Sequence, residues 1–173
     1  MINMIVAMNK IGVIGVNNNL PWKIKDDLKL FKAYTLNNDI LMGKNTFKSL
    51  GSKPLPKRHN IIISSSLKKQ DLDFDNISIY SNLENILKEY QNNNKDLWII
   101  GGRQIYLNSL PYINKAYVSL VHNKVNGDIV MPFFWEETTI SGINKWNLLE
   151  ETFYDKNIDN EYSFTLKVFE QSK

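Results

Sequence analysis

The chain of 173 residues contains no cysteine and only two histidines, His59 and His122. Without thiols it can form neither a disulfide nor a thiolate metal site. Two histidines exclude a histidine-rich metal centre and most serine–histidine chemistry. Arginine is also rare, since Arg58 and Arg103 are the only two among 21 basic residues. Any catalysis must therefore rest on carboxylates, hydroxyls, lysines or a bound organic cofactor.

Long apolar runs and strong net charge are absent as well. No segment approaches the roughly 20 apolar residues that span a bilayer, and residues 1–10 lack the basic start and the apolar length of a signal peptide. The net charge of +3 is too mild for a nucleic-acid-binding surface. We expect a cytoplasmic protein with neither a membrane nor a nucleic-acid partner. The length favours a single domain over residues 1–173, with a monomer as the default.

Short β-branched runs alternate with helical patterns, which is typical of an α/β sheet. Several runs are continuously apolar, as expected of central strands covered on both faces. After residue 130 the pattern changes to two alternating segments around a polar turn, which predicts a C-terminal antiparallel hairpin. The expected strands are 2–8, 39–43, 60–65, 77–80, 96–102, 115–121, 146–154 and 161–170, and the expected helices are 25–36, 44–50, 83–91 and 103–109.

Two adjacent acids, Asp26 and Asp27, begin the first predicted helix. Helical spacing places Asp27 beside the apolar stripe of Leu28 and Phe31, whereas Asp26, about 100° round the helix, is expected to face solvent. For Asp26 a helix-start role is enough, because carboxylates favour the positive end of a helix. A carboxylate on an apolar face is costly without a partner and usually has a raised pKa. Asp27 is therefore the candidate acid, and hydride or proton chemistry on a bound heterocycle is the plausible class.

Two strand-to-helix turns have the features of phosphate sites. At residues 43–46 a glycine ends a buried strand, and a helix begins with Lys44; at Gly101-Gly102 a second strand ends before Arg103. A third strand ends in Ser64-Ser65-Ser66, which either holds a phosphate or forms a solvated turn. No GxGxxG is present, so the dinucleotide-binding fingerprint is missing. Arg58 suggests a site that needs a planar guanidinium, and chance placement is an equal alternative.

Five segments together resemble the dihydrofolate reductase family along nearly the whole chain. They are VIGVNNNLPWKIKDDLKLFKAYTL, ILMGKNTFKSLG, PLPKRHNIIIS, WIIGGRQIY and NGDIVMP. The resemblance implies a three-layer fold in which about four helices flank an eight-stranded, mostly parallel mixed sheet ending in the antiparallel hairpin. It also implies NADPH as hydride donor and 7,8-dihydrofolate as substrate.

The same resemblance assigns roles to individual residues. Asp27 would hold the pterin and promote protonation of N5, Trp22 would hold a water near it, and Ser119 would offer a hydroxyl to it. Arg58 would pair with the glutamate of folate, and Tyr106 would lie beside the nicotinamide and pterin. Walls of the substrate site would be Ile5, Val6, Ala7, Leu28, Phe31, Lys32, Leu50, Leu55 and Ile100. Cofactor positions would be Ala7, Ile14, Gly15, Asn18, Leu20, Gly43, Lys44, Asn45, Thr46, Ser64, Ser65, Gly101, Gly102, Arg103, Gln104 and Ile105. The family also has a cis bond between glycines at the position of Gly101-Gly102.

Some positions depart from the family pattern. Leu20 stands where some bacterial members have methionine, which keeps the position apolar. Lys44 replaces a common arginine and Ser81 a basic residue, so both weaken the expected site for the ribose 2′-phosphate. An inserted residue near Ser52 and Lys53 lets either lie near the glutamate tail.

Two other functions fit less well. Another NADPH reductase of the same fold, such as the pyrimidine-reducing domain of riboflavin synthesis, would not explain Asp27 after Pro-Trp or the PLPKR segment. A catalytically inactive nucleotide- or RNA-binding module would explain neither the acid nor the mild charge.

Overall fold

The computed structural model describes residues 1–15, 19–137 and 145–172. Its main sheet has eight strands in the order β5-β4-β3-β6-β1-β7-β10-β9, and β2 pairs with β8 in a separate small sheet. The described strands are β1 (Ile2–Asn9), β2 (Val13–Gly15), β3 (Asp39–Gly43), β4 (His59–Ile63), β5 (Ile77–Tyr80), β6 (Leu97–Gly101), β7 (Lys115–Val121), β8 (Ile129–Val130), β9 (Trp146–Tyr154) and β10 (Phe164–Gln171). The helices are α1 (Lys25–Thr35), α2 (Lys44–Ser49), α3 (Leu83–Gln91) and α4 (Arg103–Ser109), with short 3₁₀ turns η1 (Lys69–Asp71), η2 (Leu110–Tyr112) and η3 (Phe134–Glu136).

The expected eight-stranded mixed sheet, four helices and C-terminal hairpin are confirmed. β3 pairs in parallel with β4 on one side and with β6 on the other. β4 in turn pairs in parallel with β5, and β6 pairs in parallel with β1. β10 pairs antiparallel with both β7 and β9. Two short strands, β2 and β8, were not predicted, because runs of three and two residues carry too little periodicity to detect.

Packing divides the chain into two compact units. The first consists of Met1–Met4 and Lys32–Ile113, and the second of Ile5–Phe31 and Asn114–Lys173.

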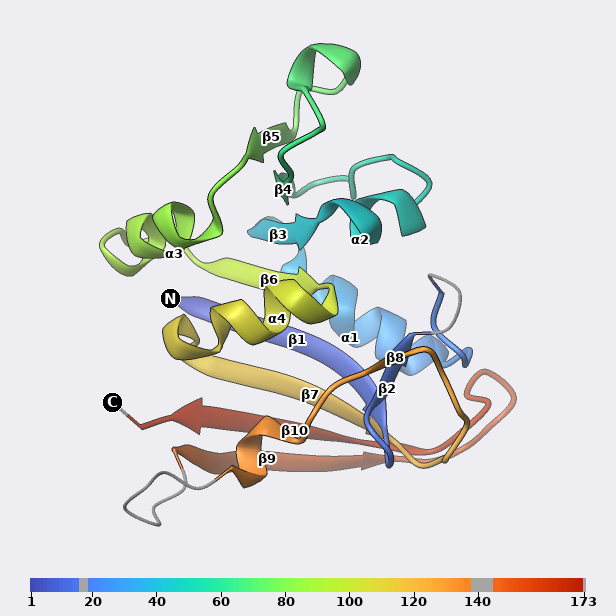
Figure 1. Cartoon of the computed structure of the whole chain (residues 1–173). Coiled ribbons are helices and arrows are strands. Elements are labelled where there is room, and N and C mark those ends of the chain that lie inside the picture. The colour runs from blue at the N-terminus through green and yellow to red at the C-terminus, as the bar shows by residue number, and fades with distance from the viewer. Residues whose placement is uncertain (16–18, 138–144, 173) are drawn as a thin grey trace. The chain divides into compact units, whose positions relative to one another are not determined.

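The first unit is built on the parallel strands. Every residue of β6 is buried, as are Ile40, Leu41 and Met42 of β3, so these apolar runs form the interior. Helix α4 lies along β6 in Figure 1, and it also contacts α3. β4 ends at Ile63, two residues earlier than predicted, because Ser64 Oγ accepts the backbone N–H groups of Ser66 and Leu67 and turns the chain.

The second unit is built on the antiparallel strands β7, β10 and β9, which lie side by side in Figure 1. Trp22, Ile24, Val121 and Phe164 form a buried cluster in it. β10 begins at Phe164 rather than at 161, because the residues before it pair elsewhere: Asn160 bridges to Ile24, and Glu161 N–H donates to Lys23 O at 3.0 Å. The start of α1 is thereby attached to the turn between β9 and β10.

None of the helices within the described ranges is both long enough and apolar enough to cross a membrane.

Candidate active site

Asp27 lies in the first turn of α1, in the second unit. Its side chain is half-buried, and Ser119 Oγ of β7 donates a hydrogen bond to Asp27 Oδ1 at 2.6 Å. Burial raises the pKa of the Asp27 carboxyl above its ordinary value, and the Ser119 hydrogen bond opposes part of that rise. The carboxyl is therefore held in one position and can be protonated at a higher pH than an exposed aspartate.

Asp27 lines a cavity of about 370 Å³. Leu28 and Leu20, which also line it, are 59% and 45% exposed, so apolar surface is left open beside the acid. An acid next to open apolar surface suits a flat heterocycle that carries hydrogen-bonding atoms on one edge. The residues that line the cavity are Leu20, Trp22, Lys23, Ile24, Lys25, Asp27, Leu28 and Asp159. Sequence analysis named four of them; the other four were not predicted.

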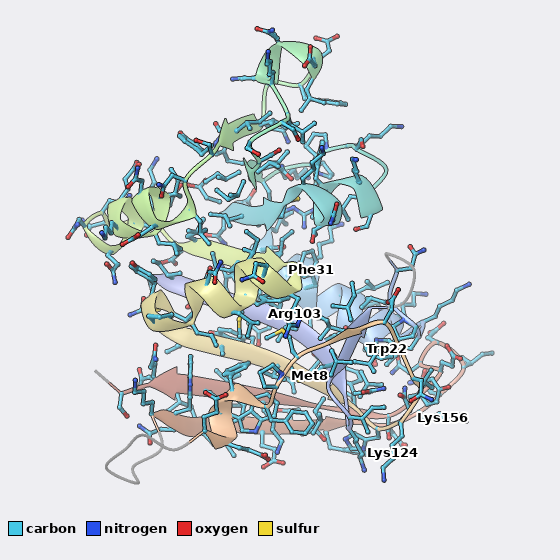
Figure 2. All side chains as sticks on the ribbon, viewed as in Figure 1. Met8, Trp22, Phe31, Arg103, Lys124 and Lys156 are labelled. Carbon is cyan, nitrogen blue, oxygen red and sulfur yellow. The ribbon has the colours of Figure 1, made fainter. Side chains whose placement is uncertain are left out.

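Trp22, labelled in Figure 2, lines the same cavity. Its ring is 5% exposed and packs in the cluster with Ile24 and Phe164. Nε1 is buried and has no hydrogen-bond partner among the described residues. An unpaired buried donor costs about 1–3 kcal/mol, so this N–H is suited to a partner from outside the chain.

The prediction that Asp26 faces solvent was wrong. Asp26 is half-buried rather than solvated, and its Oδ2 accepts a hydrogen bond of 2.8 Å from Asn160 Nδ2. Asn160 is fully buried and lies 134 residues away. Helical periodicity showed which side of the helix Asp26 occupies, but it could not show that a distant turn covers that side.

The remaining predicted residues of the second unit lie on β1, β2 and α1. Ile5 and Val6 are buried in β1, and Ala7 packs against the Trp22 cluster. Ile14 and Phe31 are half-buried, and Gly15 lies on β2. Asn18 is outside the described residues.

In the first unit the two glycine turns lie side by side. A Cβ on Gly102 would lie 3.4 Å from Thr46 Oγ1, and one on Gly43 would lie 3.2 Å from Ile105 Cγ1. Gly43 and Gly102 are the residues that precede α2 and α4. The starts of α2 and α4 therefore lie close together, and helix starts are positions that suit phosphate groups.

The peptide bond between Gly101 and Gly102 is cis, as the resemblance implied. A Cβ on Gly101 would lie 3.2 Å from Tyr106 Oη, so the buried Tyr106 ring lies directly against this glycine. Arg103 and Gln104 follow on the exposed start of α4, where Gln104 Nε2 donates to Asn108 Oδ1.

Lys44 and the serine turn form a polar cluster. Lys44 Nζ donates to Ser66 Oγ at 2.7 Å, and Ser66 Oγ lies 3.4 Å from Ser64 Oγ. Sequence analysis named Ser64 and Ser65 as site residues, whereas the serine that contacts Lys44 is Ser66. Asn45 and Ser65 are exposed. The cluster offers one cation and several hydroxyls to an anion.

Arg58 is buried and 8% exposed. Its Nε donates to Pro56 O and its Nη1 to Thr35 Oγ1, both at 3.0 Å. No carboxylate of the described part of the chain lies within ion-pair distance of it. Burial lowers the pKa of the guanidinium, which remains a cation held in a fixed direction.

Asn60 was not named from the sequence, although it supports Arg58. It is fully buried, and its Nδ2 donates to the carbonyls of Leu55 and Arg58 at 3.0 Å. Its Oδ1 accepts from Leu55 N–H, so one side chain shapes the loop between α2 and β4. A polar residue next to the run Ile61 to Ile63 was the available signal. Leu50 and Leu55 are half-buried, Lys32 is exposed and Ile100 is buried.

The chain is similar to known proteins along nearly its whole length. The dihydrofolate reductase family model matches residues 1–171. The chain is 32% identical to the dihydrofolate reductase of Bacillus subtilis (strain 168) over 171 residues, which cover 99% of this chain and 95% of that protein. It is 35% identical to the enzyme of Buchnera aphidicola subsp. Acyrthosiphon pisum over 167 residues, which cover 96% and 97% of the two chains.

A solved structure of similar fold is dihydrofolate reductase from Enterococcus faecalis complexed with NADP(H) and RAB-propyl. It matches with a TM-score of 0.85 and 26% identity, and covers 100% of this chain and 97% of that one. A family model that spans nearly every residue, together with relatives above 30% identity, establishes the relationship. The chain belongs to the dihydrofolate reductase family.

Proposed function

We propose how the chain carries out the reaction of its family, the NADPH-dependent reduction of 7,8-dihydrofolate to 5,6,7,8-tetrahydrofolate. The observation that carries the proposal is the Asp27 carboxyl. It is half-buried beside an apolar cavity, is fixed by Ser119, and has a raised pKa.

Asp27 acts on the pterin in two ways. Its two oxygens can accept hydrogen bonds from neighbouring N–H groups on the edge of the ring, which fixes the orientation of the ring. Because burial disfavours the charged carboxylate, Asp27 also favours protonation of the bound ring at N5 near neutral pH. Trp22 Nε1 is suited to hold a water between the acid and the ring.

NADPH, when bound, supplies the hydride for C6. The residues that fit its phosphates are those at the two helix starts and the serine turn: Gly43, Lys44, Asn45, Thr46, Ser64, Ser65, Gly101, Gly102, Arg103, Gln104 and Ile105. Gly43 and Gly102 support this, because each stands at a helix start and brings no side chain to cap it. In the second unit, Ala7, Ile14, Gly15 and Leu20 would contact the nicotinamide, and in the first unit Tyr106 would do so.

In the second unit Asp27 would bind the pterin, and in the first unit Arg58 would bind the glutamate of the substrate. A buried guanidinium without a carboxylate partner suits the α-carboxylate of the glutamate, which it can bind in a bidentate manner. The further residues that would contact the substrate are Ile5, Val6, Ala7, Leu28 and Phe31 in the second unit, and Lys32, Leu50, Leu55 and Ile100 in the first. We further propose that residues 1–173 act as one domain and as a monomer in the cytoplasm.

The test is the loss of NADPH absorbance when 7,8-dihydrofolate is added to the purified protein. Turnover should require dihydrofolate and should be blocked by a 2,4-diaminopteridine, which presents an amidine-like edge to a carboxylate. NADPH oxidation that is independent of dihydrofolate, or insensitive to the inhibitor, would contradict the proposal.

A further inference from the structure

Asn160 binds both the backbone and the side chain of the residue before Asp27. Its Oδ1 accepts the Asp26 N–H at 3.1 Å, and its Nδ2 donates to Asp26 Oδ2 at 2.8 Å. Asn160 is fully buried and is itself held, since its N–H donates to Asn157 Oδ1 at 2.9 Å. One side chain from the β9–β10 turn is thus hydrogen-bonded to the start of α1.

Helix α1 needs such a partner. The first four N–H groups of a helix have no acceptor within the helix, and asparagine is among the best side chains for capping them. The residue before α1 is Ile24, whose side chain has no acceptor. The chain therefore supplies acceptors from the turn: Asp159 O receives the Lys25 N–H at 3.1 Å, and Asn160 Oδ1 receives the next.

We propose that Asn160 is a positioning residue for Asp27, which holds the first turn of α1 so that the carboxyl keeps its place beside Ser119 and away from water. The inference rests on the proposed function, because it assigns Asn160 a part in the same reaction. It also gives Asp26 a role, as the residue through which the turn holds the catalytic acid.

Loss of the hydrogen bonds from Asn160 to Asp26 should lower kcat more than it weakens cofactor binding. Without Asn160 the Asp26 N–H and carboxylate each lose a partner, and the first turn of α1 loosens. Water then reaches Asp27, whose pKa is raised mainly by burial, so that pKa should fall toward its ordinary value. The charged residues that share the cavity with Asp27 are Lys23, Lys25 and Asp159, and all three are unchanged by a substitution at 160.

The decisive experiment exchanges the two partners. Asn160→Asp places a second carboxylate against Asp26 and should lower kcat for dihydrofolate at pH 7 about tenfold, with the KM for NADPH unchanged. Asp26→Asn alone keeps an acceptor for Asn160 Nδ2 and should stay within about threefold of the unmodified rate. The double variant Asp26→Asn/Asn160→Asp again pairs one amide with one carboxylate, with the two positions exchanged. It should recover most of the kcat lost in Asn160→Asp.

A second measurement does not depend on turnover. Carboxyl NMR titration of Asp27 should give a lower pKa in Asn160→Ala than in the unmodified protein. Asn147→Ala is the matched control, because Asn147 lies on the same hairpin and its Nδ2 binds the exposed Ser172 Oγ. It should leave both kcat and the Asp27 pKa unchanged.

The outcomes separate the two proposals. The inference is wrong if Asn160 variants have a lower melting temperature but the same kcat and the same Asp27 pKa. It is also wrong if the double variant Asp26→Asn/Asn160→Asp recovers none of the lost kcat. In either case Asn160 only stabilises the fold. If the unmodified protein does not reduce dihydrofolate, the proposed function fails instead, and the NMR titration still tests whether Asn160 positions Asp27.

Discussion

Ser119 Oγ donates a hydrogen bond of 2.6 Å to Asp27 Oδ1, joining β7 to α1 across 92 residues of sequence. The bond favours the ionised carboxylate, whereas burial of the same group favours the protonated form. Burial is the larger of the two effects, so the pKa of Asp27 is raised. Ser119 therefore limits the rise in the pKa of Asp27.

Removal of that donor should move the pH profile. Ser119→Ala takes away the hydrogen bond that opposes burial, so the apparent pKa of hydride transfer should rise above that of the unmodified enzyme. Ser119→Thr keeps a hydroxyl and should keep the profile. The measurement is the single-turnover rate against pH; a profile for Ser119→Ala that is unchanged or shifted downward would contradict the account.

Asp27 should also weaken the fold at neutral pH. Its pKa is higher in the folded protein than the ordinary 3.8, so its contribution to stability is fully present below about that pH and is lost as pH rises through the folded value. Asp27→Asn keeps an acceptor for Ser119 and carries no charge. It should raise the melting temperature at pH 7 by about 2–4 °C, the effect of about 1 kcal/mol in a protein of this size.

The advantage of Asp27→Asn should shrink as the pH is lowered through the folded pKa and disappear below pH 3.8, where the aspartate becomes protonated in the folded and the unfolded state. Melting curves at several pH values measure this. A variant less stable than the unmodified protein at pH 7 would show that the buried charge is better compensated than its contacts indicate.

Lys44 should set the preference for NADPH over NADH. The ammonium is held 2.7 Å from Ser66 Oγ, where it can meet a ribose 2′-phosphate. Lys44→Ala should raise the KM for NADPH about tenfold, the effect of one lost charge-assisted hydrogen bond, and leave the KM for NADH unchanged. Lys44→Arg should strengthen the preference, because guanidinium binds phosphate with a planar fork.

Lys48, exposed near the other end of α2, is the matched control for Lys44. Lys48→Ala should alter neither constant. Equal losses for NADPH and NADH in Lys44→Ala would place the lysine against a phosphate that both cofactors share.

Substitution by alanine should destabilise the fold by different amounts at two glycines with positive φ. Gly12 has φ +83°, and a Cβ there would lie 2.3 Å from the backbone oxygen of Met131, the residue after β8. Gly51 has φ +75° and open space around it. Gly51→Ala should cost about 1–2 kcal/mol from backbone strain alone, and Gly12→Ala about 3 kcal/mol or more because the clash adds to the strain. Urea unfolding measures both, and equal losses would contradict the close approach at Gly12.

Local patterns predicted most of the fold. β3, β5, β7 and α3 begin and end where the sequence indicated, because their apolar residues are bounded by polar or glycine residues. The choice of Asp27 over Asp26 also followed from helical spacing. The cis bond at Gly101-Gly102 followed only from the family resemblance.

Contacts between distant segments could not be predicted in this way. Asn160 binds Asp26 from 134 residues away, and Asn60 shapes the Arg58 loop by bonds to three backbone groups. Nothing in the period of a helix or strand reports such partners. A buried asparagine shows itself only when the fold brings together the donors and acceptors that it needs.

The most direct test compares Asp27→Asn with Asp26→Asn at pH 7. The account predicts that Asp27→Asn lowers the rate of dihydrofolate reduction by about a hundredfold or more, as expected for loss of a positioned acid, while NADPH binds as before and Asp26→Asn keeps most of the activity. The rate of the unmodified enzyme should titrate with an apparent pKa above the ordinary 3.8. Full activity in Asp27→Asn, or a larger loss in Asp26→Asn, would contradict the central claim.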